Sequence, residues 1–106
     1  MTTNIRMKEG ALIVILPKEI DDHVTLGIRS ELDRLISCKR IDQLIFDFAQ
    51  TELMDSSGIG MILGRYKKLQ FSKVKVQVIN AKPRIRTTME LAGLHKVIKI
   101  NEGEMV

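Results

Sequence analysis

The sequence predicts a single α/β domain in which an N-terminal β-hairpin leads into a mixed, mostly parallel sheet with crossover helices. Segments with apolar residues at helical spacing alternate with short, strongly apolar segments typical of buried strands. Parallel strands need such crossover connections, so this alternation favours a parallel sheet. With 106 residues, 44% of them hydrophobic, the chain suits one domain with a substantial core, and we assign residues 1–106 to it.

The N-terminal segment predicts the hairpin. Apolar and charged residues alternate over residues 5–7, a turn with glycine occupies residues 8–10, and residues 11–16 form the longest apolar run of the chain. Pro17 lacks a backbone N–H and ends this second strand. Residues 18–22 are expected to be a loop that leads into a helix.

The first helix is predicted over residues 23–37, because its apolar residues recur at helical spacing: Val24, Ile28, Leu32, Leu35 and Ile36. Asp21 or Asp22 can cap its N-terminus, since a carboxylate accepts hydrogen bonds from the free N–H groups of the first turn. Residues 43–49 have the pattern of a compact buried strand, which Asp47 interrupts.

A second helix is expected after the turn at residues 55–58, with the apolar stripe Ile59, Ile62, Leu63, Tyr66 and Leu69. Gly58, Gly60 and Gly64 lie along this helix, and each costs about 1 kcal/mol relative to alanine. We therefore expect these glycines to permit the close approach of a backbone, from a neighbouring strand or from a partner.

The C-terminal part predicts one strand, one helix and a short terminal strand. Valines alternate over residues 74–78, as in a strand with one buried face. Pro83 fits the first turn of the helix, and Gly93 fits its C-terminal cap. The apolar face of this helix is expected to carry Ile85, Met89 and Ala92. Residues 97–100 would add the terminal strand.

The most informative segment is the turn Asp55-Ser56-Ser57-Gly58, where an apolar stretch gives way to the glycine-spaced helix. Asp and Ser favour a helix start, because their side-chain oxygens accept hydrogen bonds from its unpaired N–H groups. A serine held there is exposed and faces the positive end of the helix dipole, which favours a phosphate. The segment predicts a modified hydroxyl, on Ser56 or on Ser57. Asp55 can cap the helix and help to present the hydroxyl to a kinase.

Nothing in the sequence forms a recognisable catalytic, metal or cofactor site. Gly58 and Gly60 are not followed by the Lys-Ser/Thr pair of a phosphate-binding loop, and neither serine lies in the Gly-x-Ser-x-Gly pattern of hydrolases. His23 and His95 are the only histidines, and with the distant Cys38 they do not make a zinc set. We therefore predict no enzyme activity, no metal and no cofactor.

The net charge of +4 does not by itself indicate nucleic acid, because the chain lacks a platform of aromatic residues on which bases stack. An acidic protein partner accounts for the charge equally well. No apolar run approaches the length of a membrane span, and the N-terminus carries no export signal. The single cysteine, Cys38, fits a reducing compartment. We expect a cytoplasmic protein that contacts neither nucleic acid nor membrane directly.

The continuation of the serine motif resembles a known family. Residues 54–60 (Met-Asp-Ser-Ser-Gly-Ile-Gly) and residues 62–67 (Ile-Leu-Gly-Arg-Tyr-Lys) are similar to the signature of bacterial anti-sigma factor antagonists, the small STAS domains, and look closest to the sporulation members. Residues 19–21, 44–48 and 91–94 agree, so the resemblance covers essentially the whole chain. This chain departs from the family where it has Lys18 in place of a common glycine.

The resemblance implies a switch between partners. The unmodified form of such proteins binds an anti-sigma factor that is also a serine kinase, with ADP or ATP bound, and this releases the sigma factor for transcription. The kinase phosphorylates the first serine of the motif, Ser56 here, and a serine phosphatase reverses the reaction. The residues expected to contact the kinase are Asp21, His23, Asp55, Ser57, Gly58, Ile59, Gly60 and Met61.

The competing interpretation is a ligand-binding or scaffold module with the same STAS fold, in a stress-signalling complex. A scaffold need not dissociate when it is phosphorylated. Binding measured before and after phosphorylation therefore separates the two interpretations.

Overall fold

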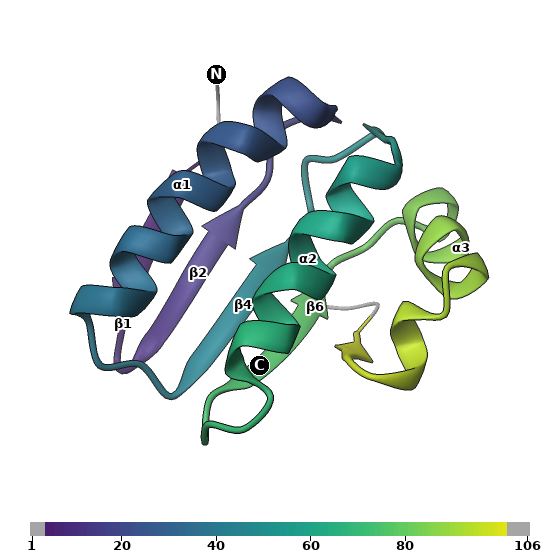
Figure 1. The fold of residues 1–106 in the computed structure, drawn as a ribbon. Helices are drawn as coiled ribbons and strands as arrows, with labels where there is room; N and C mark the ends of the chain where they lie inside the picture. The colour runs from purple at the N-terminus through teal and green to yellow at the C-terminus, as the bar shows by residue number, and fades with distance from the viewer. Residues whose placement is uncertain (1–3, 102–106) are drawn as a thin grey trace.

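The computed structural model describes residues 4–101, in which a sheet carries helices on one face (Figure 1). In spatial order, its strands are β1 (Asn4–Lys8), β2 (Ala11–Ile15), β4 (Gln43–Asp47), β6 (Lys75–Ile79) and β7 (Lys99–Ile100). The helices are α1 (Asp22–Cys38), α2 (Ser56–Leu69) and α3 (Pro83–Leu91), and a 3-10 helix, η1 (Leu94–Lys96), precedes β7. β1 is antiparallel to β2 and the other neighbours are parallel, which confirms the predicted mixed sheet. Residues 1–3 and 102–106 of the predicted domain lie outside the described residues.

The predicted hairpin is confirmed, and its turn is the pair Glu9-Gly10 between Lys8 and Ala11. Both turn residues have positive φ, 47° and 83°, as tight hairpin turns that match the twist of the strands require. A Cβ on Gly10 would lie 2.5 Å from Oδ2 of Asp42, so glycine also leaves room for the segment that enters β4.

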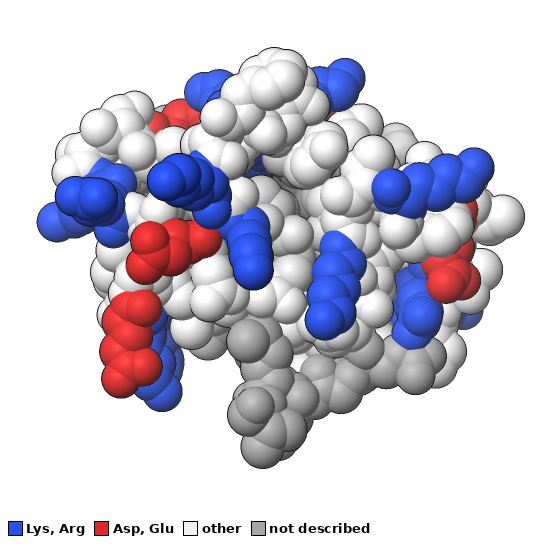
Figure 2. All heavy atoms as spheres, turned by 90° about the horizontal axis from the view of Figure 1, so that it is seen from below, with Lys and Arg blue, Asp and Glu red and all other residues white. Residues whose placement is uncertain are grey.

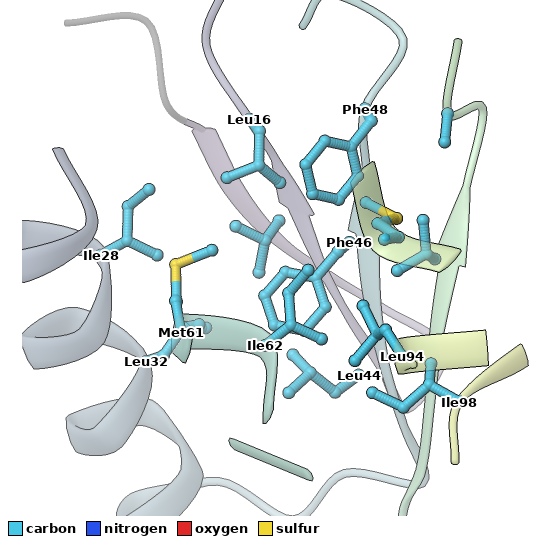
Figure 3. Packing of buried hydrophobic residues seen from close by; sticks show 14 of the residues in the cluster. Leu16, Ile28, Leu32, Leu44, Phe46, Phe48, Met61, Ile62, Leu94 and Ile98 are labelled. Carbon is cyan, nitrogen blue, oxygen red and sulfur yellow. The ribbon is translucent and has the colours of Figure 1, made fainter. Parts of the chain in front are cut away.

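The hydrophobic core lies between the sheet and the helices α1 and α2, which run side by side across it (Figure 1). Figure 3 shows side chains of both helices meeting those of the sheet. Fully buried members include Ile28, Leu32, Leu44, Phe46, Met61 and Ile62. The helices are also joined by an ion pair, in which Nε of Arg65 lies 3.2 Å from Oδ1 of Asp33. None of the described helices is long and apolar enough to cross a membrane.

Two very short strands form a second sheet that the sequence did not reveal. β3 (Glu19–Ile20) pairs in parallel with β5 (Leu53–Met54). The expectation of a loop over residues 18–22 is therefore wrong for the two residues of β3. Two-residue strands show no periodicity, so only the tertiary structure reveals them. Around this pair, the backbone N–H of Glu52 donates to the carbonyl of Lys18 at 2.8 Å, and that of Asp55 donates to the carbonyl of Ile20 at 3.1 Å.

Element boundaries differ slightly from the predicted ones near the C-terminus. The terminal strand is confined to Lys99–Ile100, because the backbone N–H groups of Val97 and Ile98 donate to the carbonyl of Leu94 in the turn that follows η1. Ala92 is exposed and caps α3, so its assignment to the buried face is wrong, whereas Ile85 and Met89 are buried as predicted. Gly93 follows with φ 78°, the left-handed conformation that ends helices.

Candidate functional site

The site is built on the N-terminus of α2, where Ser56 is the first helical residue and Asp55 the cap. The Asp55 backbone is extended, with φ −91° and ψ −178°, so its side chain turns back toward the helix. Its Oδ1 accepts a hydrogen bond from the backbone N–H of Ser57 at 2.9 Å and another from the Ser57 hydroxyl. The predicted capping role of Asp55 is confirmed.

The two serines of the motif have different environments. Ser57 is partly buried, and its hydroxyl donates to the capping carboxylate of Asp55. Ser56 is exposed, and its hydroxyl has no hydrogen-bond partner among residues 4–101. Asp55 therefore orients Ser57 and leaves the hydroxyl of Ser56 free in solvent.

The start of α1 lies at the same end of the molecule as the start of α2 (Figure 1). Ile20 pairs with Met54 in the β3–β5 sheet, and an aspartate follows each of them directly. Oδ1 of Asp21 accepts from the backbone N–H of Val24 at 2.9 Å, so Asp21, and not Asp22, caps α1. Two helix N-termini, each with partial positive charge, thus point toward one surface.

The surface around Ser56 carries more exposed carboxylates than basic side chains, despite the net positive charge of the chain, and its basic neighbours are the exposed Lys18 and the partly buried Arg29. Its exposed carboxylates are those of Glu19, Asp21, Asp22 and Asp55. Figure 2 shows the molecule from below, the end that holds the C-termini of α1 and α2, with several Lys and Arg side chains spread over it and a smaller number of Asp and Glu side chains toward its edges. Exposed basic residues at or just after those two C-termini are Lys39, Arg40, Lys67, Lys68 and Lys73. The charge is therefore distributed unevenly between the two ends.

The glycines of α2 have three different surroundings, and none of them meets the backbone of a neighbouring strand, while the expected approach of a partner stays a prediction. Gly58 is buried, and a Cβ there would lie 2.6 Å from Cγ of Met54 and 3.4 Å from a methyl group of Ile20. Gly58 therefore makes room for the β3–β5 sheet and has no surface for a kinase. Gly60 is exposed and lies near Arg29, whereas nothing lies within 4 Å of a Cβ built on Gly64.

Met61 offers no exposed surface in this structure, which argues against its predicted direct contact with a partner. Its side chain is fully buried and points toward Ile28 of α1 in the core (Figure 3). Because the helix has about 3.6 residues per turn, Met61 projects from the buried side of α2, away from the exposed Ser56. Ile59 is partly buried and packs against the same core, but it retains some surface. His23 is exposed in the first turn of α1, next to its cap.

Leu26 is an exposed apolar residue near the site that sequence reasoning missed. It lies in the second turn of α1, and 67% of it is exposed. Leu53, on β5, is 49% exposed. The signal was present in the sequence, because Leu26 falls outside the buried stripe of α1 and would ordinarily be polar there.

Two surface hollows of about 470 and 450 Å³ lie away from Ser56. The first is lined by Tyr66, Val74 and Lys99 among others, and the second by Ile13 and Ile45 on the sheet. Neither includes a residue of the segment 53–61. Ser56 thus lies on an open surface that another protein can approach.

Comparison with known proteins gives the family. The model of the STAS domain matches residues 2–104. The chain belongs to the STAS domain family. This confirms the resemblance seen in residues 54–67 and its predicted extent over essentially the whole chain.

Relatives of this STAS domain are named as regulators of anti-sigma factors. An anti-sigma F factor antagonist from Paenibacillus polymyxa is 31% identical over 107 residues, which cover 99% of this chain and 92% of that protein. An anti-sigma-B factor antagonist from Listeria monocytogenes is 26% identical over 110 residues, covering 99% of this chain and 96% of that protein.

Solved structures agree with this STAS fold. The unphosphorylated form of the anti-sigma factor antagonist SpoIIAA superposes with a TM-score of 0.84 at 25% identity, covering 93% of this chain and 87% of that one. The phosphorylated form of SpoIIAA, a Bacillus cell fate determinant, superposes with a TM-score of 0.76 at 25% identity, covering 93% and 90%.

Proposed function

We propose that this STAS domain is an anti-sigma factor antagonist controlled by phosphorylation of Ser56. In its unmodified form it binds an anti-sigma factor that is also a serine kinase, and binding releases a sigma factor for transcription. The names of the relatives support antagonism and favour a sporulation sigma factor. The observation that carries the proposal is the free, exposed hydroxyl of Ser56 at the shared end of α1 and α2.

The chemistry requires only a hydroxyl from this chain. Oγ of Ser56 attacks the γ-phosphorus of ATP, the bond from that phosphorus to the β-phosphate oxygen breaks, and ADP leaves. The hydroxyl proton passes to a base of the kinase. A serine phosphatase later directs water to the same phosphorus, which restores the hydroxyl and liberates inorganic phosphate. This assignment leaves the chain a substrate and a ligand and gives it no turnover of its own.

We define the Ser56 surface as the exposed parts of Asp21, His23, Leu26, Asp55, Ser56, Ser57, Ile59 and Gly60. Its centre is the hydroxyl to be modified, and Leu26 supplies an apolar contact at its edge. Buried apolar side chains contribute most of the binding energy at such interfaces, while exposed charges around them mainly guide association. The carboxylates of Asp21 and Asp55 therefore favour a kinase whose docking face is basic.

The phosphate weakens binding through charge at the interface while the fold stays intact. It adds about −1.5 to −2 charges to a surface that is already acidic. In the complex, the γ-phosphate position of the nucleotide must lie opposite Ser56, so phosphoserine faces the phosphates of bound ADP. An uncompensated charge in a contact costs about 2–5 kcal/mol, or roughly thirty- to several-thousand-fold in affinity. Ser56 is exposed in the free protein, so its modification displaces no packed group.

Calorimetry with the cognate kinase and ADP tests the proposal. The unmodified protein is expected to bind, and protein phosphorylated at Ser56 is expected to bind at least about thirty-fold more weakly. Ser56→Ala, incubated with kinase and ATP in the same way, is the matched control and should keep the affinity of the unmodified protein. Equal affinities before and after phosphorylation would instead indicate a scaffold module.

A further inference from the structure

We propose that Arg29 of α1 binds the phosphate of phosphorylated Ser56 within the same molecule. The inference rests on the proposed phosphorylation of Ser56. It adds a cationic side chain of the neighbouring helix that donates hydrogen bonds to the phosphoserine.

The geometry of Gly60 places Arg29 beside the second turn of α2, one turn after Ser56. A Cβ built on Gly60 would lie 3.4 Å from Nη2 of Arg29. Gly60 is four residues after Ser56, and residues at this spacing are neighbours on one helix face, about 5–6 Å apart at Cβ. Because Cα–Cβ bonds tilt toward the helix N-terminus, that Cβ position lies on the side of Ser56. Nη2 is therefore within about 9 Å of the Cβ position of Ser56.

The distance between Nη2 of Arg29 and Cβ of Ser56 is short enough for the phosphoserine and arginine side chains to span. A phosphate extends the side chain of Ser56 outward, and the arginine side chain has several rotatable bonds with which to follow it. Gly60 has no side chain to separate the two groups. A side chain at position 60 would contact the guanidinium of Arg29.

Arg29 has a side-chain hydrogen-bond donor without a partner in the described structure. Its Nε is buried and lacks a hydrogen-bond partner, and Arg29 makes no ion pair within residues 4–101. In contrast, Arg34 of the same helix hydrogen-bonds to Glu31, which holds the pKa of that carboxyl below its ordinary value. An unpaired buried donor is costly, so an incoming acceptor is favourable. Phosphate suits a guanidinium in particular, because its oxygens can accept two parallel N–H bonds.

The charges around Ser56 explain why a contact with Arg29 would stabilise the phosphate. The charged and titratable groups around Ser56 include Asp55 at the start of α2, Glu19 of β3, and Asp21, Asp22 and His23 at the start of α1. The four carboxylates oppose a phosphate, while the two helix N-termini and Arg29 favour it. Arg29 is therefore expected to stabilise the dianionic phosphate in the free, phosphorylated protein.

Phosphorus NMR of protein with phosphoserine encoded genetically at position 56 tests the inference without any kinase. Arg29→Gln is expected to raise the second pKa of the phosphoserine by about half a unit or more, since a neighbouring cation favours the charged form. Arg29→Lys, which keeps the charge and loses the planar fork, should give a smaller increase. Arg40→Gln removes an exposed arginine that follows α1 at its far end, and should leave the titration unchanged.

A second measurement uses the unaltered sequence. In arginine-labelled protein, the Nε–H resonance of Arg29, assigned by its absence in Arg29→Lys, should shift and exchange more slowly once residue 56 is phosphorylated. Identical phosphoserine titrations in the wild type and Arg29→Gln, with no change in this resonance, would overturn the inference. A different result would contradict the proposed function, namely the absence of kinase-dependent phosphate on Ser56.

Discussion

The carboxylate of Asp55 accepts hydrogen bonds from both the backbone N–H and the hydroxyl of Ser57, and this pairing makes two adjacent serines chemically different. The hydroxyl of Ser57 is part of the helix cap. Ser56 has an identical side chain one residue earlier, but its hydroxyl is exposed and has no partner within residues 4–101. The hydroxyl of Ser56 is therefore accessible without breaking the cap of α2.

Substitution of each serine should separate their roles. Ser56→Ala is expected to abolish phosphate incorporation by the cognate kinase and to retain binding to it. Ser57→Ala is expected to remain a substrate, because the reacting oxygen is unchanged. Mass spectrometry of the phosphorylated peptides is the measurement, and label on Ser57 in the wild-type protein would contradict the assignment.

Asp21 caps α1, and the adjacent Asp22, which does not cap the helix, provides a matched control for the capping bond. Asp21→Ala should lower the free energy of unfolding by about 1 kcal/mol, since it removes the acceptor of the Val24 N–H bond. Asp22→Ala loses only a favourable interaction with the helix dipole and should cost about 0.3–0.5 kcal/mol. Urea denaturation measures both. Equal losses would show that the cap bond contributes nothing beyond charge.

Two glycines of α2 should respond in opposite directions to alanine. Gly64→Ala is expected to stabilise the protein by about 0.5–1 kcal/mol, because the added methyl group meets no atom within 4 Å and favours the helix. Gly58→Ala should destabilise it relative to Gly64→Ala, since its methyl group would overlap the side chain of Met54. Thermal denaturation monitored by circular dichroism ranks the two, and stabilisation by both would refute the packing role of Gly58.

Met61 should affect stability and leave the docking surface unchanged. Met61→Ala creates a cavity beneath α2 and is expected to cost about 2–5 kcal/mol of unfolding free energy. Its affinity for the kinase, measured well below its melting temperature, should stay within about threefold of wild type. A large loss of affinity in a variant of undiminished stability would show that Met61 does reach the partner.

Leu26 should contribute to binding through its exposed apolar surface. Leu26→Ala is expected to weaken binding to the kinase about tenfold, which corresponds to about 1.4 kcal/mol. Phe71→Ala is the matched control, because Phe71 is 95% exposed but lies beyond the C-terminus of α2, roughly 20 Å from Ser56. Calorimetry compares the two. An equal effect of both variants would exclude a specific contact at Leu26.

Periodicity predicted the larger elements well, because burial imposes a repeat on every residue of a long helix or strand. The stripe of α1 and the apolar run of β2 are examples, and both are found where the pattern places them. The caps were likewise predictable, since Asp21 and Asp55 act on backbone groups two or three residues away. The β3–β5 sheet was not, because its partners are more than thirty residues apart and each strand has two residues.

By itself, the sequence determined the fold class, the family signature and the position of a serine pair at a helix start, because these depend on local chemistry and on a period shared by many residues. The tertiary structure decided which serine is free, that Gly58 and Met61 are buried, and that Arg29 lies beside Gly60, one turn after Ser56. Those outcomes depend on contacts between segments distant in the chain. Such contacts produce no repeating pattern in the sequence of either segment, so neither segment alone predicts them.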